Sequence, residues 1–218
     1  MIHKTILLTG FLCIAGFLSA QQFSLGVRAG YTLANFDINN TNAPGIFFNP
    51  GKKRSIGGLH IGLESRWKLD EHWAVQAGLQ YNQKGYQSEI FWPSGPANAR
   101  KIFHYLNIPV VGNYLIWKGL SLQAGLEAGM LIDSRIKSGG ENISNKDLDI
   151  YSNLDLGFIA GLEYSIGKSF FLGARHSWGV VNVFGNTDFT DDAGNPLNIS
   201  AHNRALQVSA GYRYAFGN

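Results

Sequence analysis

The sequence has almost no cysteine and few charged residues. Cys13 is its only cysteine, and Asp, Glu, Lys and Arg together make up 15% of the 218 residues. A single thiol cannot form an intramolecular disulfide, which excludes a small secreted scaffold held together by disulfides. The 18 basic and 15 acidic residues nearly balance, so we expect no nucleic-acid partner.

Long apolar runs are lacking outside the N-terminal segment. Residues 6–18 are mostly apolar, follow Lys4 and lead into Ser19 and Ala20. This run is shorter than the ~20 residues of a transmembrane helix, and its flanks are typical of a secretory signal peptide. We expect residues 1–20 to be a cleaved signal peptide and residues 21–218 to form one exported domain.

Glycine and aromatic residues are abundant instead, and they follow an alternating pattern. In LGVRAGYTL, residues 25–33, apolar side chains occupy every second position, and glycine, Arg28 or threonine occupies the others. Strict alternation predicts a β-strand with one apolar and one polar face. The pattern recurs at residues 57–69, 73–84, 102–117, 120–133, 154–166, 169–179 and 204–216.

The lengths of these segments and of their connections indicate a membrane barrel. Most segments approach the about nine to eleven residues that a tilted strand needs to cross a bilayer. Short connections and long polar ones alternate, as in outer-membrane barrels with short periplasmic turns and longer outer loops. The short ones span residues 69–72, 118–119 and 167–168, and the long ones span residues 35–56, 85–101, 134–153 and 180–203. We predict an all-β, eight-stranded antiparallel up-and-down transmembrane barrel with periplasmic termini.

Aromatic residues gather near both ends of the predicted strands. Amphipathic rings concentrate at the two membrane interfaces, so we predict an aromatic belt at each. Near the short connections the belt comprises Trp67, Trp73, Trp117, Phe170, Tyr214 and Phe216, and near the long ones it comprises Tyr31, Tyr81 and Trp178.

The polar faces of the strands predict the barrel interior. Eight strands enclose a bore that side chains can just fill, and the glycines leave room there for a few large polar groups. Opposite charges in such a bore can pair, whereas an unpaired one is costly. We predict a structural charge network that plugs the lumen, with an ion path as the alternative. Its members are Arg28, Arg66, Lys84, Arg175 and Arg213, and Glu64, Glu127, Asp133, Asp155 and Glu163. Pro109 cannot donate to a ladder, which predicts a bulge or kink in residues 102–117.

Candidate catalytic and metal-binding residues are weakly patterned. An enzyme at the outer rim would need a histidine beside a serine or an aspartate. His104, His176 and His202 fall toward the outer strand ends, where we expect interface residues and no catalytic group. The segment 187–198 offers Asp188, Asp191, Asp192 and Asn195 to a calcium ion. Their spacing departs from the calcium-loop pattern, so we expect a solvated loop and neither metal nor cofactor.

Four segments resemble one known family. They are Ala20-Gln21 at the end of the leader, LGVRAGYTLANF from Leu25, YLNIPVVGNY from Tyr105 and AGYRYAF from Ala210. In this order the chain resembles the outer-membrane β-barrel family of Bacteroidota, with its porin-family and PorT-like members. Asn107 departs from the family pattern, which often has an acidic residue before Ile-Pro.

The resemblance also implies a partner during biogenesis. Gly211, Tyr214 and Phe216 match the glycine-and-aromatic pattern that the barrel-assembly machinery recognises in terminal strands. We therefore expect that machinery and outer-membrane lipid as partners.

The expected function is that of a small outer-membrane barrel in a Gram-negative bacterium, structural or weakly conducting and not an enzyme. Its four long loops are candidates for binding an extracellular ligand or partner. The alternatives are a narrow pore for ions or small solutes, an accessory component of a secretion or surface-assembly complex, and a rim hydrolase or acyltransferase. A continuous water path would favour the pore, and a filled lumen would favour the structural or accessory functions.

Overall fold

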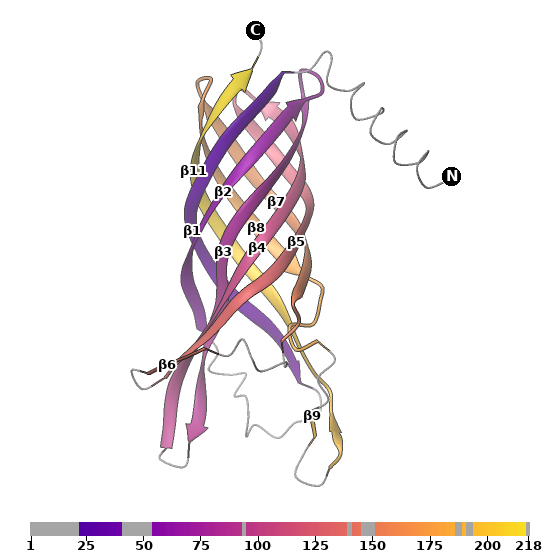
Figure 1. Cartoon of the computed structure of the whole chain (residues 1–218). Helices are drawn as coiled ribbons and strands as arrows, with labels where there is room; N and C mark the ends of the chain where they lie inside the picture. The colour runs from indigo at the N-terminus through magenta and orange to yellow at the C-terminus, as the bar shows by residue number, and fades with distance from the viewer. Residues whose placement is uncertain are drawn as a thin grey trace, which may run out of the picture.

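Eight long antiparallel strands form a closed ring (Figure 1). The computed structural model describes residues 22–40, 54–92, 95–138, 141–144, 151–185, 189–190 and 194–216. The ring consists of β1 (Phe23–Asn40), β2 (Arg54–Lys68), β3 (Trp73–Trp92), β4 (Gly95–Trp117), β5 (Leu120–Ser138), β7 (Leu154–Ile166), β8 (Phe170–Gly179) and β11 (Ile199–Phe216). Neighbours along the chain pair, and β1 pairs with β11 to close the ring. The predicted eight-stranded antiparallel barrel is confirmed.

The barrel carries apolar side chains outside and polar ones inside. On its outer surface Leu126 is 58% exposed and Phe158 is 55% exposed, whereas the interior residues Lys84 and Asn107 are 1% and 0% exposed. A water-soluble protein shows the opposite distribution. The alternation of the sequence therefore produces a lipid-facing surface around a polar core. No helix in the described part of the chain is long and apolar enough to cross a membrane.

At one end of the barrel, tight turns connect neighbouring strands. Gly119 and Gly167 adopt positive φ values of 80° and 64° there, which a residue without a Cβ tolerates best. In the β2–β3 turn, the Asp70 carboxylate accepts hydrogen bonds of 2.7 Å from the backbone N–H groups of His72 and Trp73. We call this the short-turn end, and it also holds the C-terminus of β11 (Figure 1). The opposite end is the long-loop end.

The strands continue farther toward the long-loop end than the sequence pattern predicted. The pairing of β3 with β4 runs without a break from Gln80 opposite Asn107 to Trp92 opposite Gly95. Figure 1 shows these two strands leaving the barrel as a hairpin. Much of the predicted connection 85–101 is therefore strand, and shorter strands lie in two other connections: β6 (Glu141–Ser144), β9 (Phe189–Thr190) and β10 (Pro196–Leu197).

A β-bulge in β5 changes which residues face the lumen. Leu131 and Asp133 pair with consecutive residues of β4, so Ile132 is an extra residue. One inserted residue exchanges the two faces of a strand beyond it. Ser134 is accordingly buried, while Asp133 turns outward and pairs with the half-exposed Arg135 at 2.8 Å. The prediction that Asp133 faces the lumen is wrong.

Pro109 does not cause the predicted bulge. On one side it pairs with Glu127 in regular register. On the other side the pairing of β3 with β4 stops at Ala77 and resumes at Gln80 with the same register. Proline has no N–H group to donate, and the β3–β4 ladder accordingly has a gap at this position, but the register of the two strands does not change. Gly78 lies in that gap.

Candidate functional site: the filled lumen

Five charged side chains meet inside the barrel near the short-turn end. We call Arg28, Arg66, Arg213, Glu64 and Glu163 the arginine–glutamate cluster. Arg28 contacts Glu64 at 2.8 Å and Glu163 at 2.6 Å. Arg213 contacts the same two carboxylates at 2.7 and 3.0 Å, and Arg66 contacts Glu163 at 2.9 Å. Three cations thus share two buried anions, and each glutamate is bound from more than one strand.

Side-chain amides extend this cluster toward the opposite wall. Gln76 donates a hydrogen bond to Glu64, and Gln123 donates one of 3.1 Å to Glu163. Gln123 also donates to the Asn113 side-chain oxygen at 2.6 Å. These contacts join β2, β3, β4, β5 and β7 across the bore, so a continuous hydrogen-bonded layer fills this level of the barrel.

An aromatic ring lies between two of the arginines. The Phe171 ring centre is 4.6 Å from the guanidinium carbon of Arg28 and 4.4 Å from that of Arg213. Both distances fit cation–π contacts. The sequence pattern did not assign Phe171 to the lumen. Phe171 lies two residues before Gly173, on the polar face of β8, and this position could have indicated that its ring faces the lumen.

Lumenal glycines provide the space that these long side chains occupy. A Cβ atom added at Gly173 would lie 2.7 Å from the Nη1 atom of Arg28. One added at Gly161 would lie 2.9 Å from the Cγ atom of Arg175. Both separations are shorter than real Cβ atoms show. The glycine-rich polar faces of the strands therefore accommodate arginine side chains from neighbouring strands.

A second charged group lies between the arginine–glutamate cluster and the long-loop end. Lys84 contacts Glu127 at 2.7 Å and Asp155 at 3.0 Å. Its Nζ atom also lies 5.4 Å from the centre of the Tyr105 ring. We call Lys84, Glu127 and Asp155 the lysine triad. One buried cation here holds two carboxylates from two other strands.

The long-loop end of the bore is filled by a buried apolar group, which we call the outer aromatic cluster. The Phe36 ring packs at a tilt against Tyr86 and stacks on Phe103, with centroid distances of 4.8 and 5.2 Å. Most of its members come from strand extensions or from segments that the pattern predicted as loops, so the sequence analysis missed it. The members are Phe36, Tyr86, Phe103, Tyr105, Val183, Phe184, Ile199 and Ala201.

All predicted lumenal charges except Asp133 therefore face the interior. Arg28, Arg66, Arg213, Glu64 and Glu163 form one cluster, and Lys84, Glu127 and Asp155 form another. Arg175 is buried between them and contacts Gln123, whose Oε1 atom accepts a 2.7 Å hydrogen bond from its Nε atom.

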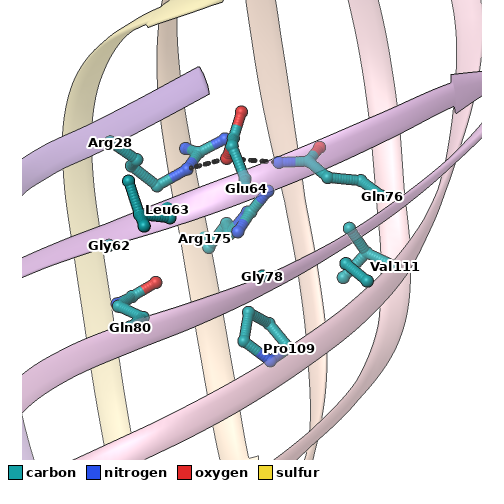
Figure 2. A pocket seen from close by; sticks show the side chains of 11 residues that line it. Arg28, Gly62, Leu63, Glu64, Gln76, Gly78, Gln80, Pro109, Val111 and Arg175 are labelled. Atoms are coloured by element: carbon teal, nitrogen blue, oxygen red, sulfur yellow. Dashed lines mark hydrogen bonds and ion pairs between the residues drawn. The ribbon is translucent and has the colours of Figure 1, made fainter. Parts of the chain in front are cut away.

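Two cavities adjoin the arginine–glutamate cluster. The smaller one has a volume of about 10 Å³, and Arg28, Glu64, Gln80 and Arg175 are among its lining residues (Figure 2). The centre of a water-sized group can move through this volume, so the cavity has room for one water molecule or one slightly larger monatomic group. The larger one, of about 330 Å³, opens at the short-turn end. It is lined partly by Arg66, Lys68, Asp70, Glu71, Lys168 and Arg213.

The predicted belt residues lie on the outer surface. At the short-turn end, the Phe216 ring lies 4.9 Å from that of Tyr214 and 5.8 Å from that of Phe23. Trp73, Trp117 and Phe170 are also exposed there, and Trp67 is half-buried against Phe23. Toward the other end, Tyr31 and Trp178 are exposed and Tyr81 is half-buried. Tyr31 precedes Leu33, the last exposed large apolar residue of β1.

The three histidines singled out for catalysis lie on three different strands. The His104 Nδ1 atom is 2.5 Å from the Tyr81 hydroxyl, and the His176 ring packs on Trp178 at 4.2 Å. His202 pairs in register with Asp37. Among the described residues, no group of three or more His, Cys, Asp or Glu side chains could hold a metal ion. Asp188, Asp191 and Asp192 of the calcium alternative lie outside the described residues, as do the predicted signal peptide and its Cys13.

Comparison with known proteins gives a family match and several distant structural likenesses. The outer membrane protein beta-barrel domain family matches residues 19–185. Ail from Yersinia pestis is 16% identical with a TM-score of 0.47, covering 88% of this chain and 98% of Ail. Neisserial surface protein A (NspA) is 12% identical with a TM-score of 0.48, covering 89% and 97%. OprG from Pseudomonas aeruginosa is 11% identical with a TM-score of 0.47, also covering 89% and 97%.

No curated protein matches the sequence. The family match spans most of the chain, and the closed antiparallel ring with its apolar outer surface is the structure that such a domain requires. Both observations place the protein in the outer membrane. The chain belongs to the outer membrane protein beta-barrel domain family and is a small outer-membrane β-barrel protein.

Proposed function

We propose that this protein is a non-conducting barrel that anchors strand extensions and loops at the cell surface. The observation that carries this proposal is the filled lumen. The arginine–glutamate cluster, the lysine triad and the outer aromatic cluster occupy successive levels of a bore that eight strands leave just wide enough for side chains. The predicted structural network is thereby favoured over the ion path.

The length of the strands supports an anchoring function. On β4 the large exposed apolar residues lie between Ile108 and Trp117. That length agrees with the about nine to eleven residues that cross a bilayer. The rest of β4, from Gly95 to Asn107, and its partner in β3 extend beyond this band. The protein thus uses roughly half of its longest strand to build structure outside the membrane.

We also propose how the barrel is oriented in the membrane and how the chain is exported and assembled. Following the usual arrangement of such barrels, the short-turn end and both termini lie in the periplasm, and the extensions face the exterior. Residues 1–20 act as a cleaved signal peptide, and Gly211, Tyr214 and Phe216 present the terminal-strand pattern to the barrel-assembly machinery. The segments LGVRAGYTLANF and YLNIPVVGNY support a position among the PorT-like barrels of Bacteroidota. An extracellular ligand or a surface-assembly partner would bind the extensions.

Planar-bilayer recording tests whether the filled lumen prevents conduction. Purified protein is inserted into a bilayer, and a comparison of unboiled with boiled gel mobility establishes that the inserted material is a folded barrel. We expect no stepwise steady current. Large, ion-selective currents from the folded protein would contradict the proposal and favour a narrow pore.

A further inference from the structure

Among the described residues, the charged groups between the short-turn end and the outer aromatic cluster carry one more positive than negative charge. The carboxylates there are fewer than the sequence pattern predicted, because the β5 bulge turns Asp133 outward. A buried charge without a counter-charge is expensive in the low-dielectric interior of a protein. The cations of this part of the lumen are Arg28, Arg66, Lys84, Arg175 and Arg213, and its anions are Glu64, Glu127, Asp155 and Glu163.

Of these five cations, Arg175 is the one that the described carboxylates leave without an ion pair. Arg175 is 4% exposed, and its Nε atom donates to Gln123. Its Nη2 atom is buried and makes no hydrogen bond. Glu64, Glu163 and Glu127 act on this guanidinium only from beyond ion-pair distance. Each of the other four cations contacts at least one carboxylate directly.

The small lumenal cavity lies beside this guanidinium. Arg175 and Gln80 both line it (Figure 2), and the Nε2 atom of Gln80 is a second buried donor without a partner. Gly78 and Pro109, at the gap in the β3–β4 ladder, form part of its wall. Two unpartnered donors, one of them charged, thus border a space of about 10 Å³.

We propose that this cavity binds one small monovalent anion of the halide class. The anion supplies the missing counter-charge to Arg175 and accepts a hydrogen bond from Gln80. A water molecule would satisfy the donors and leave the charge uncompensated. Sulfate, phosphate and carboxylates are larger than the space. Glu64 also lines the cavity, but Arg28, Arg213 and Gln76 already hold its two oxygen atoms.

The anion exchanges with solution through the short-turn end. Arg66 and Arg213 line the cavity of about 330 Å³ at that end and also belong to the arginine–glutamate cluster. Asp70 and Glu71 also line this opening, but Lys68, Lys168 and the two arginines outnumber them, and an opening with a net positive charge concentrates anions. The outer aromatic cluster fills the opposite end of the bore.

Bromide provides a direct test because it can be located by anomalous diffraction. The folded full-length barrel is crystallised with bromide, and its unfolding midpoint is measured in sodium bromide and in sodium gluconate at equal ionic strength. We expect an anomalous peak in the cavity beside Arg175. We also expect a midpoint that rises with bromide concentration and saturates, while gluconate has no such effect.

Two variants separate a specific site from a general salt effect. Arg175→Met removes the charge, and we expect it to lose the bromide-dependent shift while remaining at least as stable as the wild type without halide. Arg135→Met removes an arginine on the outer surface, and we expect it to keep the shift. Bromide peaks only on the surface, or the same bromide dependence in Arg175→Met, would overturn the proposal. If Arg175→Met does not fold, the wild-type anomalous map alone decides.

Discussion

At the scale of single residues, the barrel is stabilised from inside by charges that differ in how many partners they have. Glu163 is bound by three arginines and by Gln123, so the loss of one donor leaves it others. Lys84 by contrast is the only ion-pair partner of Glu127 and Asp155 among the described residues. Removing one partner of a buried ion pair is more harmful than removing the whole group, since the remaining charge stays buried.

The lysine triad allows this difference to be measured. Lys84→Met leaves two carboxylates without a cation, and we expect it to lower the free energy of unfolding by about 3–5 kcal/mol. The triple variant Lys84→Met, Glu127→Gln, Asp155→Asn removes all three charges and should lose less. Urea unfolding in lipid vesicles measures both. A triple variant less stable than Lys84→Met would show that the charges do not act as a unit.

The space that a lumenal glycine leaves for Arg28 can be tested by a substitution that fills it. We expect Gly173→Ala to destabilise the barrel by about 1–3 kcal/mol, because overpacking must displace Arg28 from its partners. Gly112→Ala is the matched control, since its Cβ would meet nothing closer than the Ala124 carbonyl oxygen at 3.7 Å. Equal unfolding free energies for the two variants would mean that Arg28 moves aside at no cost.

At the scale of strands, period-two alternation predicted which segments form the wall but not where they end. The alternation exists because one face of each strand contacts lipid. It therefore ends where β1, β3, β4 and β5 leave the bilayer, although their backbone pairing continues beyond that point. Asp133 was misplaced for a related reason, because a bulge of one residue leaves no mark in the composition. The lumenal cluster was largely predictable since charge and glycine share a face. The outer aromatic cluster was not, because long-range packing brings its members together.

The lipid-facing assignment predicts a dependence on depth along a strand. Leu126 lies midway along the exposed apolar residues of β5, whereas Ile116 lies beside the short-turn end of β4. We expect Leu126→Arg to destabilise the barrel by about 2–4 kcal/mol and Ile116→Arg by about 0–1 kcal/mol, as for midplane and interface positions. Unfolding titrations in vesicles give both values. Similar losses at the two sites would argue against a bilayer centred near Leu126.

The β2–β3 turn predicts a pH dependence in acid. Hydrogen bonds from the backbone N–H groups of Trp73 and His72 hold the pKa of Asp70 below its usual value of 3.8. A carboxyl group whose pKa is lower in the folded state stabilises that state above its unfolded pKa, and the effect disappears as pH falls through the folded value. We expect Asp70→Ala to be less stable than the wild type at pH 7 and the difference to vanish in stronger acid. A difference that is constant down to pH 2 would contradict this explanation.

At the scale of the whole molecule, charge is arranged unevenly along the barrel axis. The arginine–glutamate cluster has more cations than anions, and the lysine triad has more anions than the single cation. The two ends also differ in structure, since one has tight turns and the other has the β3–β4 hairpin (Figure 1). These asymmetries make the orientation of the barrel in its membrane a measurable property.

Cysteine labelling determines that orientation. Asn98 on the β3–β4 hairpin and Lys118 in the β4–β5 turn are both exposed, and Cys13 is the only natural cysteine. Cys13 leaves with the proposed signal peptide, so we expect Asn98→Cys to be the only reactive thiol of its variant and to react with a membrane-impermeant maleimide on intact cells. We expect Lys118→Cys to react only after the outer membrane is permeabilised. The reverse pattern would place the short-turn end outside the cell.

The pairing of β1 with β11 also determines when the barrel can be completed. It joins Phe23 to Phe216 and continues to Asn40 opposite Ile199, so the ring is closed by contacts between the two ends of the domain. Contacts of such long sequence separation carry a large loop-closure entropy and slow folding. A chain that lacks β11 would expose two unpaired strand edges, which hydrocarbon does not tolerate. We therefore expect a chain that ends before β11 to fail to insert as a stable barrel, because the closing pair of strands cannot form.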